Sequence, residues 1–348
     1  MIAKPARARR VLVCEDSKTY ALGLSRLLEY DREFEVVAVC ETAEDAIARL
    51  PGLKPDLVTM DLELPGMSGV EAIEQIMSAF PVPILVLSGH VEHRSERALL
   101  ALAAGALDAV PKHDLDLADP RSALAATLRH RAKVLSGVKV IRHPRARLGK
   151  SYAHPSWSRT ASIVGICAST GGPPALASLL ASVPATFPLP ILVVQHIAGG
   201  FVDGFAKWLD GEVPLPVRLA VPGSRPAHGV WIAPEGAHLL VDDTGRLRLD
   251  EEPVSARHRP SGDILLHSLA ATARANAVAV VLTGMGRDGA EGLGAVQRAG
   301  GMTIAQDEAT SAVYGMPRAA AECGAEIVLP LQRIAARLTA LRPTGSTP

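Results

Sequence analysis

The sequence predicts an α/β protein with two doubly wound domains, each built on a parallel sheet covered by helices. Short, continuously apolar runs alternate with amphipathic helical patterns along most of the chain, which is typical of parallel sheets buried on both faces. The alternation stops once, over residues 131–159, where Gly137, Pro144, Gly149 and Pro155 interrupt a basic segment. The length of 348 residues and the hydrophobic content of 48% suffice for two cores.

The first domain is expected over residues 9–130, as five strands that alternate with five helices. The expected strands are the apolar runs 10–14, 34–39, 56–60, 83–87 and 107–110. The helical patterns that follow them span residues 17–29, 42–50, 68–79, 92–104 and about 118–133. Because such strands run parallel, their carboxyl ends should meet at one edge of the sheet.

The second domain is expected over residues 160–342, as a Rossmann-like, mostly parallel sheet with a β-hairpin, and residues 131–159 are interpreted as an interdomain linker. Strands are expected at 162–167, 190–195, 229–232, 277–282 and 302–305. Helices are expected at 173–182, 201–209, 262–275, 290–299 and 316–322. Residues 238–249 are typical of a hairpin that turns at Asp243-Thr244-Gly245.

Composition argues against several classes of protein. No apolar stretch reaches the roughly 18 residues of a membrane span, and we expect no signal peptide because the N-terminus lacks an apolar core. The 4 cysteines form no CxxC pair, which argues against a disulfide framework or zinc site and favours a reducing cytoplasm. No acidic residue occurs between Asp119 and Asp203. We interpret this basic stretch as solvated linker and expect no nucleic-acid partner, because it shows neither aromatic interleaving that suggests base stacking nor a recognition-helix pattern.

Polar side chains follow four expected strands of the first domain. Glu15 and Asp16 follow the first strand, Asp61 the third, Ser88 the fourth and Lys112 the fifth. Clustered carboxylates repel one another unless a cation neutralises them, and carboxylate oxygens suit Mg²⁺. One carboxylate could then attack a metal-bound phosphoryl group and form an aspartyl phosphate, with Lys112 pairing with the phosphoryl oxygens. The alternative is that the acids only cap the helices that follow them.

Residues 9 to about 130 resemble the receiver domain of two-component response regulators, which has a flavodoxin-like fold. The resemblance implies that Asp61 is phosphorylated, that Glu15 and Asp16 bind Mg²⁺ together with Asp61, and that Ser88 and Lys112 are the switch hydroxyl and the signalling lysine. It also implies a CheA-type histidine kinase as phosphodonor.

Ser169 is the candidate nucleophile of the second domain. It follows the apolar run 163–168, and the glycine-rich turn after it leads into a helix opened by Pro173. The N–H groups of this turn and the helix N-terminus could stabilise developing negative charge. The alternative is a phosphate-binding or purely structural turn, although its spacing is neither that of a dinucleotide fingerprint nor that of a nucleophile elbow.

A serine nucleophile needs a base, and the base needs an acid that orients it. His196 directly follows the buried strand 190–195, and Asp288 lies in the glycine-rich turn after the strand 277–282. The glycines of that turn allow backbone N–H groups to approach a ligand, which suits an oxyanion hole. The rival bases are His228, His238, His258 and His267, and the rival acid is Asp307.

Six segments resemble the CheB family of chemotaxis protein-glutamate methylesterases and glutaminases, namely 167–173, 195–196, 258–261, 283–290, 305–310 and 314–317. The resemblance assigns Ser169 as nucleophile, His196 as base and Asp288 as orienting acid. It places the Met285 N–H in the oxyanion hole, with Thr170 assisting. The implied activity is phosphorylation-activated hydrolysis of glutamate methyl esters, and deamidation of glutamines, on methyl-accepting chemoreceptors. No cofactor is implied in the esterase site, and the receiver is implied to cover that site until it is phosphorylated.

The chain departs from the usual patterns of both families. Ala109 stands where receivers commonly have an aromatic switch residue, and His113 stands where they have a proline. Residues 197–201, Ile-Ala-Gly-Gly-Phe, replace the usual Met-Pro-Pro-Gly-Phe, and Cys167 replaces a glycine. Two other functions stay open: an interaction module with an inactive esterase fold, which the intact triad argues against, and a DNA-binding regulator, which rests on the basic linker alone.

Overall fold

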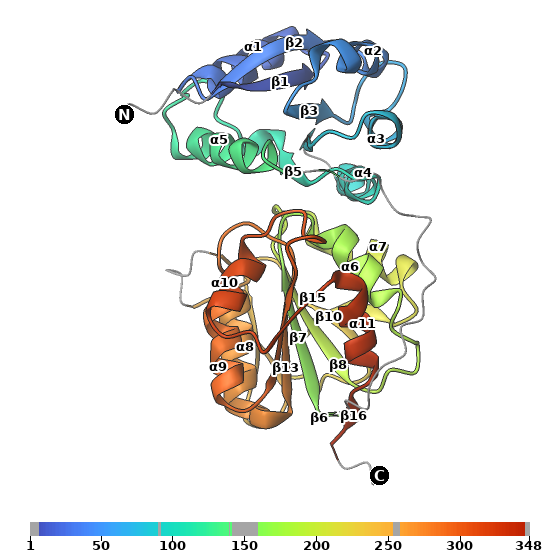
Figure 1. The fold of residues 1–348 in the computed structure, drawn as a ribbon, viewed down its shortest axis with the longest axis vertical. Helices are drawn as coiled ribbons and strands as arrows, with labels where there is room; N and C mark the ends of the chain where they lie inside the picture. The colour runs from blue at the N-terminus through green and yellow to red at the C-terminus, as the bar shows by residue number, and fades with distance from the viewer. Residues whose placement is uncertain (1–6, 90–91, 139, 141–158, 253–257, 345–348) are drawn as a thin grey trace. The chain divides into compact units, whose positions relative to one another are not determined.

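The computed structural model describes residues 7–89, 92–138, 140, 159–252 and 258–344, and the chain forms two compact units, 1–148 and 149–348 (Figure 1). Each unit contains a parallel sheet with helices on both faces, which confirms the predicted fold class. The predicted domain bounds stay predictions. Of the predicted linker, residues 131–135 continue a helix, while 139 and 141–158 lie outside the described residues.

The sheet of the first unit has the order β2-β1-β3-β4-β5, and all its pairs are parallel. Its strands are β1 (Arg9–Cys14), β2 (Phe34–Cys40), β3 (Leu57–Asp61), β4 (Ile84–Ser88) and β5 (Asp108–Pro111). The helices are α1 (Lys18–Glu29), α2 (Ala43–Leu53), α3 (Gly69–Ala79), α4 (Glu92–Ala103) and α5 (Ala123–Leu135). Right-handed crossovers place α1 on one face, where it packs with α5, and α2, α3 and α4 on the other.

Capping side chains set where the helices of the first unit begin. Ser17 and Thr42 each accept a hydrogen bond from the backbone N–H three residues later, and Ser68 forms a full capping box with Glu71. Ser122 caps α5 in the same way, so this helix begins at Ala123 and not near residue 118 as predicted.

The sheet of the second unit has the order β15-β14-β13-β7-β8-β10-β9, and all its pairs are parallel. Its strands are β7 (Ile163–Ala168), β8 (Pro190–Gln195), β9 (Val217–Leu219), β10 (Gly229–Ile232), β13 (Ala277–Val281), β14 (Met302–Gln306) and β15 (Ile327–Leu329). The predicted hairpin is β11 (His238–Val241) with β12 (Leu247–Asp250), and β6 (Thr160–Ala161) pairs with β16 (Arg342–Pro343). The three-residue strands β9 and β15 were not predicted, because they are too short to show a pattern.

Among the described residues, six helices cover the second sheet. Figure 1 shows α8 (Gly262–Thr272), α9 (Ala290–Arg298) and α10 (Met316–Glu322) on one face and α6 (Gly172–Leu180), α7 (Val202–Glu212) and α11 (Leu331–Thr339) on the other. The strand order explains most of this division. The crossovers through α6 and α7 run from β7 toward the β9 edge of the sheet, whereas those through α8, α9 and α10 run toward the β15 edge. Because crossovers between parallel strands are right-handed, the two opposite directions place the helices on opposite faces. The helix α11 is missing from the predicted helices, although its apolar residues recur at helical spacing. None of the described helices is long and apolar enough to cross a membrane.

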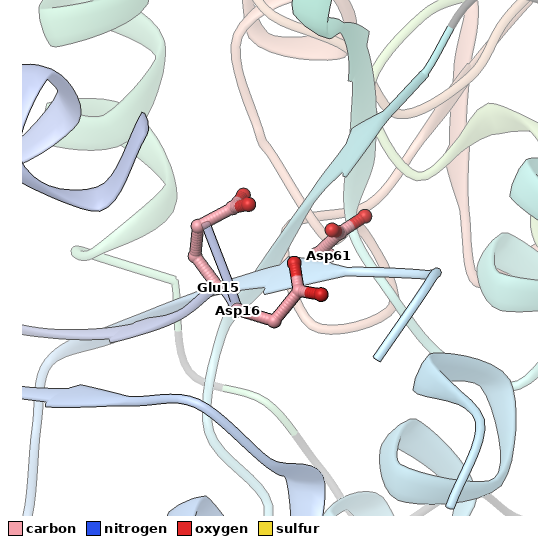
Figure 2. Close-up of side chains that lie close together, drawn as sticks. All are labelled: Glu15, Asp16 and Asp61. Atoms are coloured by element: carbon pink, nitrogen blue, oxygen red, sulfur yellow. The ribbon is translucent and has the colours of Figure 1, made fainter. Parts of the chain in front are cut away.

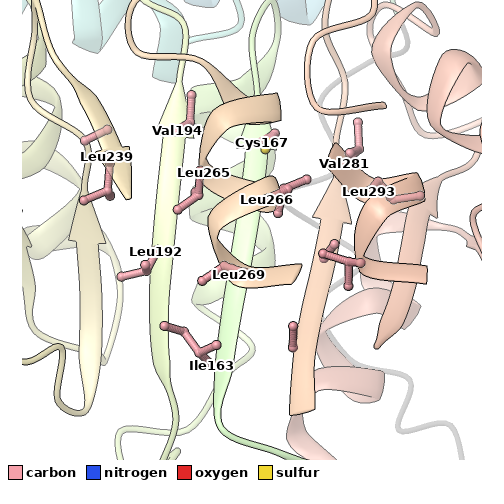
Figure 3. Packing of buried hydrophobic residues seen from close by; sticks show 14 of the residues in the cluster. Ile163, Cys167, Leu192, Val194, Leu239, Leu265, Leu266, Leu269, Val281 and Leu293 are labelled. Atoms are coloured by element: carbon pink, nitrogen blue, oxygen red, sulfur yellow. The ribbon is translucent and has the colours of Figure 1, made fainter. Parts of the chain in front are cut away.

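Aliphatic packing fixes α8 over the centre of this sheet. Leu265, Leu266 and Leu269 of α8 are fully buried against β7, β8 and β13 (Figure 3). Burying a leucine side chain contributes about 1.5–3 kcal/mol. The packing therefore holds the N-terminal end of α8 beside the carboxyl ends of the strands.

Candidate active site and phosphorylation site

The predicted acidic residues of the first unit meet at one edge of the sheet. Glu15 and Asp16 follow β1, and Asp61 ends the neighbouring strand β3, at the point where the strand order reverses (Figure 2). Each residue offers a carboxylate oxygen, and these oxygens lie within 4.8 Å of one another. Glu15 and Asp61 are buried and Asp16 is exposed, so a bound cation would keep one open side.

Lys112, which follows β5, bridges two of these acids. Its Nζ lies 2.6 Å from Glu15 Oε2 and 2.8 Å from Asp61 Oδ2. Burial raises the pKa of Glu15, and the charge of Asp61 adds to this, although Lys112 opposes both. For Lys112 itself, burial would lower the pKa, but its bonds to Asp61 and Glu15 outweigh burial and raise it. The ammonium therefore stays charged beside Asp61.

Ser88 lies at the same edge, at the end of β4. It is buried, and its Oγ donates to the Gly89 carbonyl at 3.5 Å. The strand that carries Ser88 pairs with β3 on one side and with β5, which carries the buried Ala109, on the other. The structure thus brings all five predicted residues of this domain to one edge.

The second predicted site forms at the carboxyl ends of three adjacent strands. β7 lies between β8 and β13, so Ser169 after β7 is flanked by His196 after β8 and by Asp288 in the turn after β13. Backbone hydrogen bonds tie the three loops together, because Ser169 N donates to Thr283 O at 3.0 Å and His196 N donates to Ala168 O at 2.9 Å.

The ring nitrogens of His196 have different surroundings. Nε2 lies 2.8 Å from Asp288 Oδ2, at ion-pair distance but without the orientation of a well-aligned hydrogen bond. Nδ1 is buried and has no hydrogen-bond partner within the described residues. Nδ1 is therefore the nitrogen available to a serine hydroxyl. This is the reverse of the chymotrypsin arrangement, in which Nδ1 faces the aspartate.

Asp288 is held by the N-terminal end of α8. Its carboxylate accepts hydrogen bonds from Ser261 Oγ at 2.8 Å, Gly262 N at 2.6 Å and Asp263 N at 3.1 Å. Burial alone would raise the pKa of Asp288, but the His196 ring and these N–H groups hold it well below its usual range. Asp288 is therefore an anion that can stabilise a protonated His196.

The turn after β13 approaches Ser169 closely. A Cβ at Gly284 would lie 2.7 Å from Ser169 Cβ, so a larger residue cannot occupy this position without a shift. The next residue, Met285, and Thr170 on the other side of Ser169 have backbone N–H groups that donate no hydrogen bond within the described part of the chain. Two free donors beside the serine are suited to stabilising an oxyanion.

The rival residues have other contacts. Asp307 accepts from the Thr310 N–H at 3.0 Å and the Thr310 hydroxyl at 2.6 Å, which closes its own loop. His228 Nε2 bonds the Ala185 carbonyl, and His267 is exposed on α8. His238 is fully buried and accepts from Ser261 N at 3.2 Å. His258 stacks on His196 with ring centroids 4.3 Å apart.

Comparison with known proteins decides the family. The CheB methylesterase family model matches residues 164–338, and the response regulator receiver domain model matches residues 11–119. This chain belongs to the CheB methylesterase family.

Relatives of this CheB methylesterase match it over nearly its whole length. A protein-glutamate methylesterase/protein-glutamine glutaminase 2 of Anaeromyxobacter dehalogenans is 44% identical over 332 residues, covering 94% of this chain and 95% of the relative. A protein-glutamate methylesterase/protein-glutamine glutaminase 3 of Myxococcus xanthus is 44% identical over 317 residues, covering 90% of this chain and 88% of the relative. The crystal structure of the Thermotoga maritima CheB methylesterase catalytic domain matches with a TM-score of 0.50 and 38% identity, covering 52% of this chain and 98% of that one.

Sequence reasoning gave no role to two residues that support this CheB site. Ser261 is the N-cap of α8, and its hydroxyl bonds Asp288. Gln195 is 4% exposed, and its Nε2 donates to Ser169 O at 2.9 Å and His196 O at 2.8 Å. Both belong to segments that resemble the family, but only a serine before a helical pattern is a recognisable capping signal.

Cysteine chemistry does not compete with Ser169 in this CheB methylesterase. Cys167 is fully buried directly before the nucleophile turn, and burial raises its pKa well above the usual value, with Asp288 and Asp263 adding to the effect. A thiol in this state is protonated and inert.

Proposed function

We propose that this CheB methylesterase hydrolyses glutamate γ-methyl esters of chemoreceptors, and deamidates their glutamines, with Ser169 as nucleophile, His196 as base and Asp288 as orienting acid. The observation that carries the proposal is the contact of 2.8 Å between His196 Nε2 and the anionic Asp288, on the strand ends that flank Ser169. This contact leaves His196 Nδ1 for the serine.

Ester hydrolysis then proceeds in two steps. Ser169 Oγ forms a bond to the γ-carbonyl carbon, and His196 Nδ1 takes the hydroxyl proton. As the tetrahedral intermediate collapses, the carbon–oxygen bond to the methoxy group breaks, and His196 returns the proton to form methanol. Water, deprotonated by the same nitrogen, then attacks the acyl carbon, the bond from that carbon to Ser169 Oγ breaks, and His196 passes the proton to Ser169 Oγ, which restores the serine and frees the glutamate. A glutamine follows the same path and releases ammonia.

The free N–H groups of Met285 and Thr170 are proposed to bind the oxyanion of each intermediate. Both flank Ser169, and both belong to turns held by backbone hydrogen bonds. Removing one oxyanion donor typically costs about 10² to 10³-fold in rate, which is less than the loss caused by removing the base of a triad but still a large contribution to catalysis. The test of the function as a whole is methanol release from methyl-esterified chemoreceptor, measured with and without a small-molecule phosphodonor.

Control by phosphorylation is proposed to reside at the acidic edge of the receiver. Asp61 is the phosphoacceptor, and a CheA-type histidine kinase is the physiological phosphodonor. The oxygens of Glu15, Asp16 and Asp61 are close enough to share one Mg²⁺, and hard oxygen donors match that ion. The ion would neutralise charge on the phosphoryl group. Lys112 would pair with the phosphoryl oxygens, and the buried Ser88 hydroxyl would respond to the new charge.

Asp61→Asn is expected to abolish activation by acetyl phosphate while basal methanol release continues, because the amide cannot form an acyl phosphate. The measurement is methanol release by the full chain with and without acetyl phosphate and Mg²⁺. Removing Mg²⁺ with EDTA should make the wild type behave like the variant. Asp56→Asn, at the opposite end of β3, is the matched control and should be activated normally. Equal activation of Asp61→Asn and wild type would refute the role of Asp61.

Gln195→Glu should lower the free energy of unfolding by about 2–4 kcal/mol, because a carboxylate oxygen would face the buried carbonyls of Ser169 and His196 in place of a donor. Urea unfolding of the full chain, followed by circular dichroism, measures this change. Gln332→Glu, on the exposed face of α11, is the control and should change stability by less than about 0.5 kcal/mol. Equal urea midpoints for the two variants would contradict the bridging role of Gln195.

A further inference from the structure

An aromatic ring completes the surroundings of the Lys112 ammonium. Nζ lies 4.5 Å from the centroid of the Tyr20 ring, in addition to its contacts with Glu15 at 2.6 Å and Asp61 at 2.8 Å. An ammonium over an aromatic face is attracted by the negative potential of that face. Two carboxylates and one ring face therefore surround this cation.

Local structure holds the Tyr20 ring in place. Tyr20 lies in the first turn of α1, and its N–H donates to Ser17 Oγ, the cap of that helix, at 3.4 Å. Ser17 N in turn donates to Glu15 Oε1 at 3.3 Å, and the other oxygen of Glu15 contacts Lys112. The Tyr20 hydroxyl is buried and has no hydrogen-bond partner among the described residues, so no hydrogen bond of its own sets the ring position.

We infer that Tyr20 is a positioning residue for phosphorylation, whose ring face keeps the Lys112 ammonium beside Asp61 while the phosphoryl group arrives. The inference rests on the proposed role of Asp61. A divalent cation at the same carboxylates would repel the ammonium, whereas an uncharged ring attracts it without competing for the metal. Lys112 then keeps a fixed site from which its N–H groups reach the phosphoryl oxygens.

With acetyl phosphate as donor, the step is a simple displacement. An Asp61 carboxylate oxygen forms a bond to phosphorus, the bond between phosphorus and the acetate oxygen breaks, and acetate leaves with the electron pair. Lys112 donates hydrogen bonds to phosphoryl oxygens and transfers no proton. Tyr20 touches neither reactant and acts through Lys112 alone.

Tyr20→Leu in the full chain should slow incorporation of label from radiolabelled acetyl phosphate by about 5- to 30-fold, the range that a desolvated cation–π contact supports. Tyr20→Phe keeps the ring face and should stay within about twofold of wild type. Tyr30→Leu is the matched control, because Tyr30 ends the same helix with its ring 5.2 Å from the Arg129 guanidinium, and it should phosphorylate normally.

A double-mutant cycle separates positioning from a merely structural role. In a Lys112→Ala background, Tyr20→Leu should slow phosphorylation no further, because the group through which it acts is absent.

In the metal-free protein, the NMR signal of the Lys112 ε-methylene, assigned with Lys112→Arg, should lose its ring-current shift in Tyr20→Leu and keep it in Tyr20→Phe.

Three outcomes would overturn the inference: a wild-type rate in Tyr20→Leu, equal slowing by Tyr20→Leu in the Lys112→Ala background, or a Tyr20→Phe variant as slow as Tyr20→Leu. Failure of the proposed function is a different result. In that case the wild type itself takes up no label, or Asp61→Asn takes up as much as the wild type does.

Discussion

Ser169→Ala should lower kcat for methanol release from methyl-esterified chemoreceptor by about 10⁶-fold, the loss typical of removing the nucleophile of a serine triad. The alanine leaves the 2.8 Å contact of His196 with Asp288 intact but provides no atom that can form an acyl-enzyme. Receptor binding should persist, since the substitution removes one hydroxyl from a half-buried position. The loss is therefore expected in kcat, with little change in KM.

The matched control is Ser182→Ala, an exposed serine just beyond the end of α6, the helix that begins after the Ser169 turn. It should release methanol at the wild-type rate. Incubating the wild type with a glutamyl methyl ester peptide and quenching in acid should give a peptide adduct on Ser169, minus methanol, by mass spectrometry. Near-normal methanol release by Ser169→Ala would rule out the nucleophile.

The positions of both sites could be predicted from the sequence. Continuous apolar runs predicted parallel strands, and parallel strands bring their carboxyl ends to one edge. This is why Glu15, Asp61 and Lys112, which are far apart in the chain, were predicted together and are found in contact. The same rule predicted that Ser169, His196 and Asp288 would converge, provided that their strands are neighbours, and the strand order meets that condition.

Details that depend on side-chain packing could not be predicted from the sequence. No pattern tells which ring nitrogen of His196 faces Asp288, because this depends on how two loops approach each other. Tyr20 belongs to a helical pattern whose phase does not reveal a contact with a lysine some ninety residues later. The amphipathic helix α11 is a different omission, because its pattern is strong enough to predict a helix from the sequence. Long-range contacts, and not local propensity, determine the orientation of the His196 ring and the contact between Tyr20 and Lys112.

The environment of Asp288 makes its charge the next most sensitive feature of the site. The His196 ring and the Gly262 and Asp263 N–H groups at the N-terminal end of α8 hold the pKa of the carboxyl well below its usual range, although burial opposes this. The anion therefore persists as pH falls, down to values below the ordinary pKa of an aspartic acid. The charge does two things for His196: it favours the proton on Nε2, which leaves Nδ1 free to act as base, and it stabilises the imidazolium formed during attack.

Asp288→Asn should lower kcat by about 10⁴-fold, because a neutral amide that donates to Nε2 forces the ring proton onto Nδ1, the nitrogen that must accept the proton of Ser169. Methanol release over a range of pH measures the loss, and urea unfolding checks that the variant is folded. Asp307→Asn is the matched control, since Asp307 follows the neighbouring strand β14 and its carboxylate accepts from Thr310 of its own loop, so the activity of this variant should stay within a few-fold of wild type. If the two variants lost activity equally, or if Asp288→Asn retained more than about a tenth of wild-type kcat, the charge of Asp288 would have no special part in catalysis.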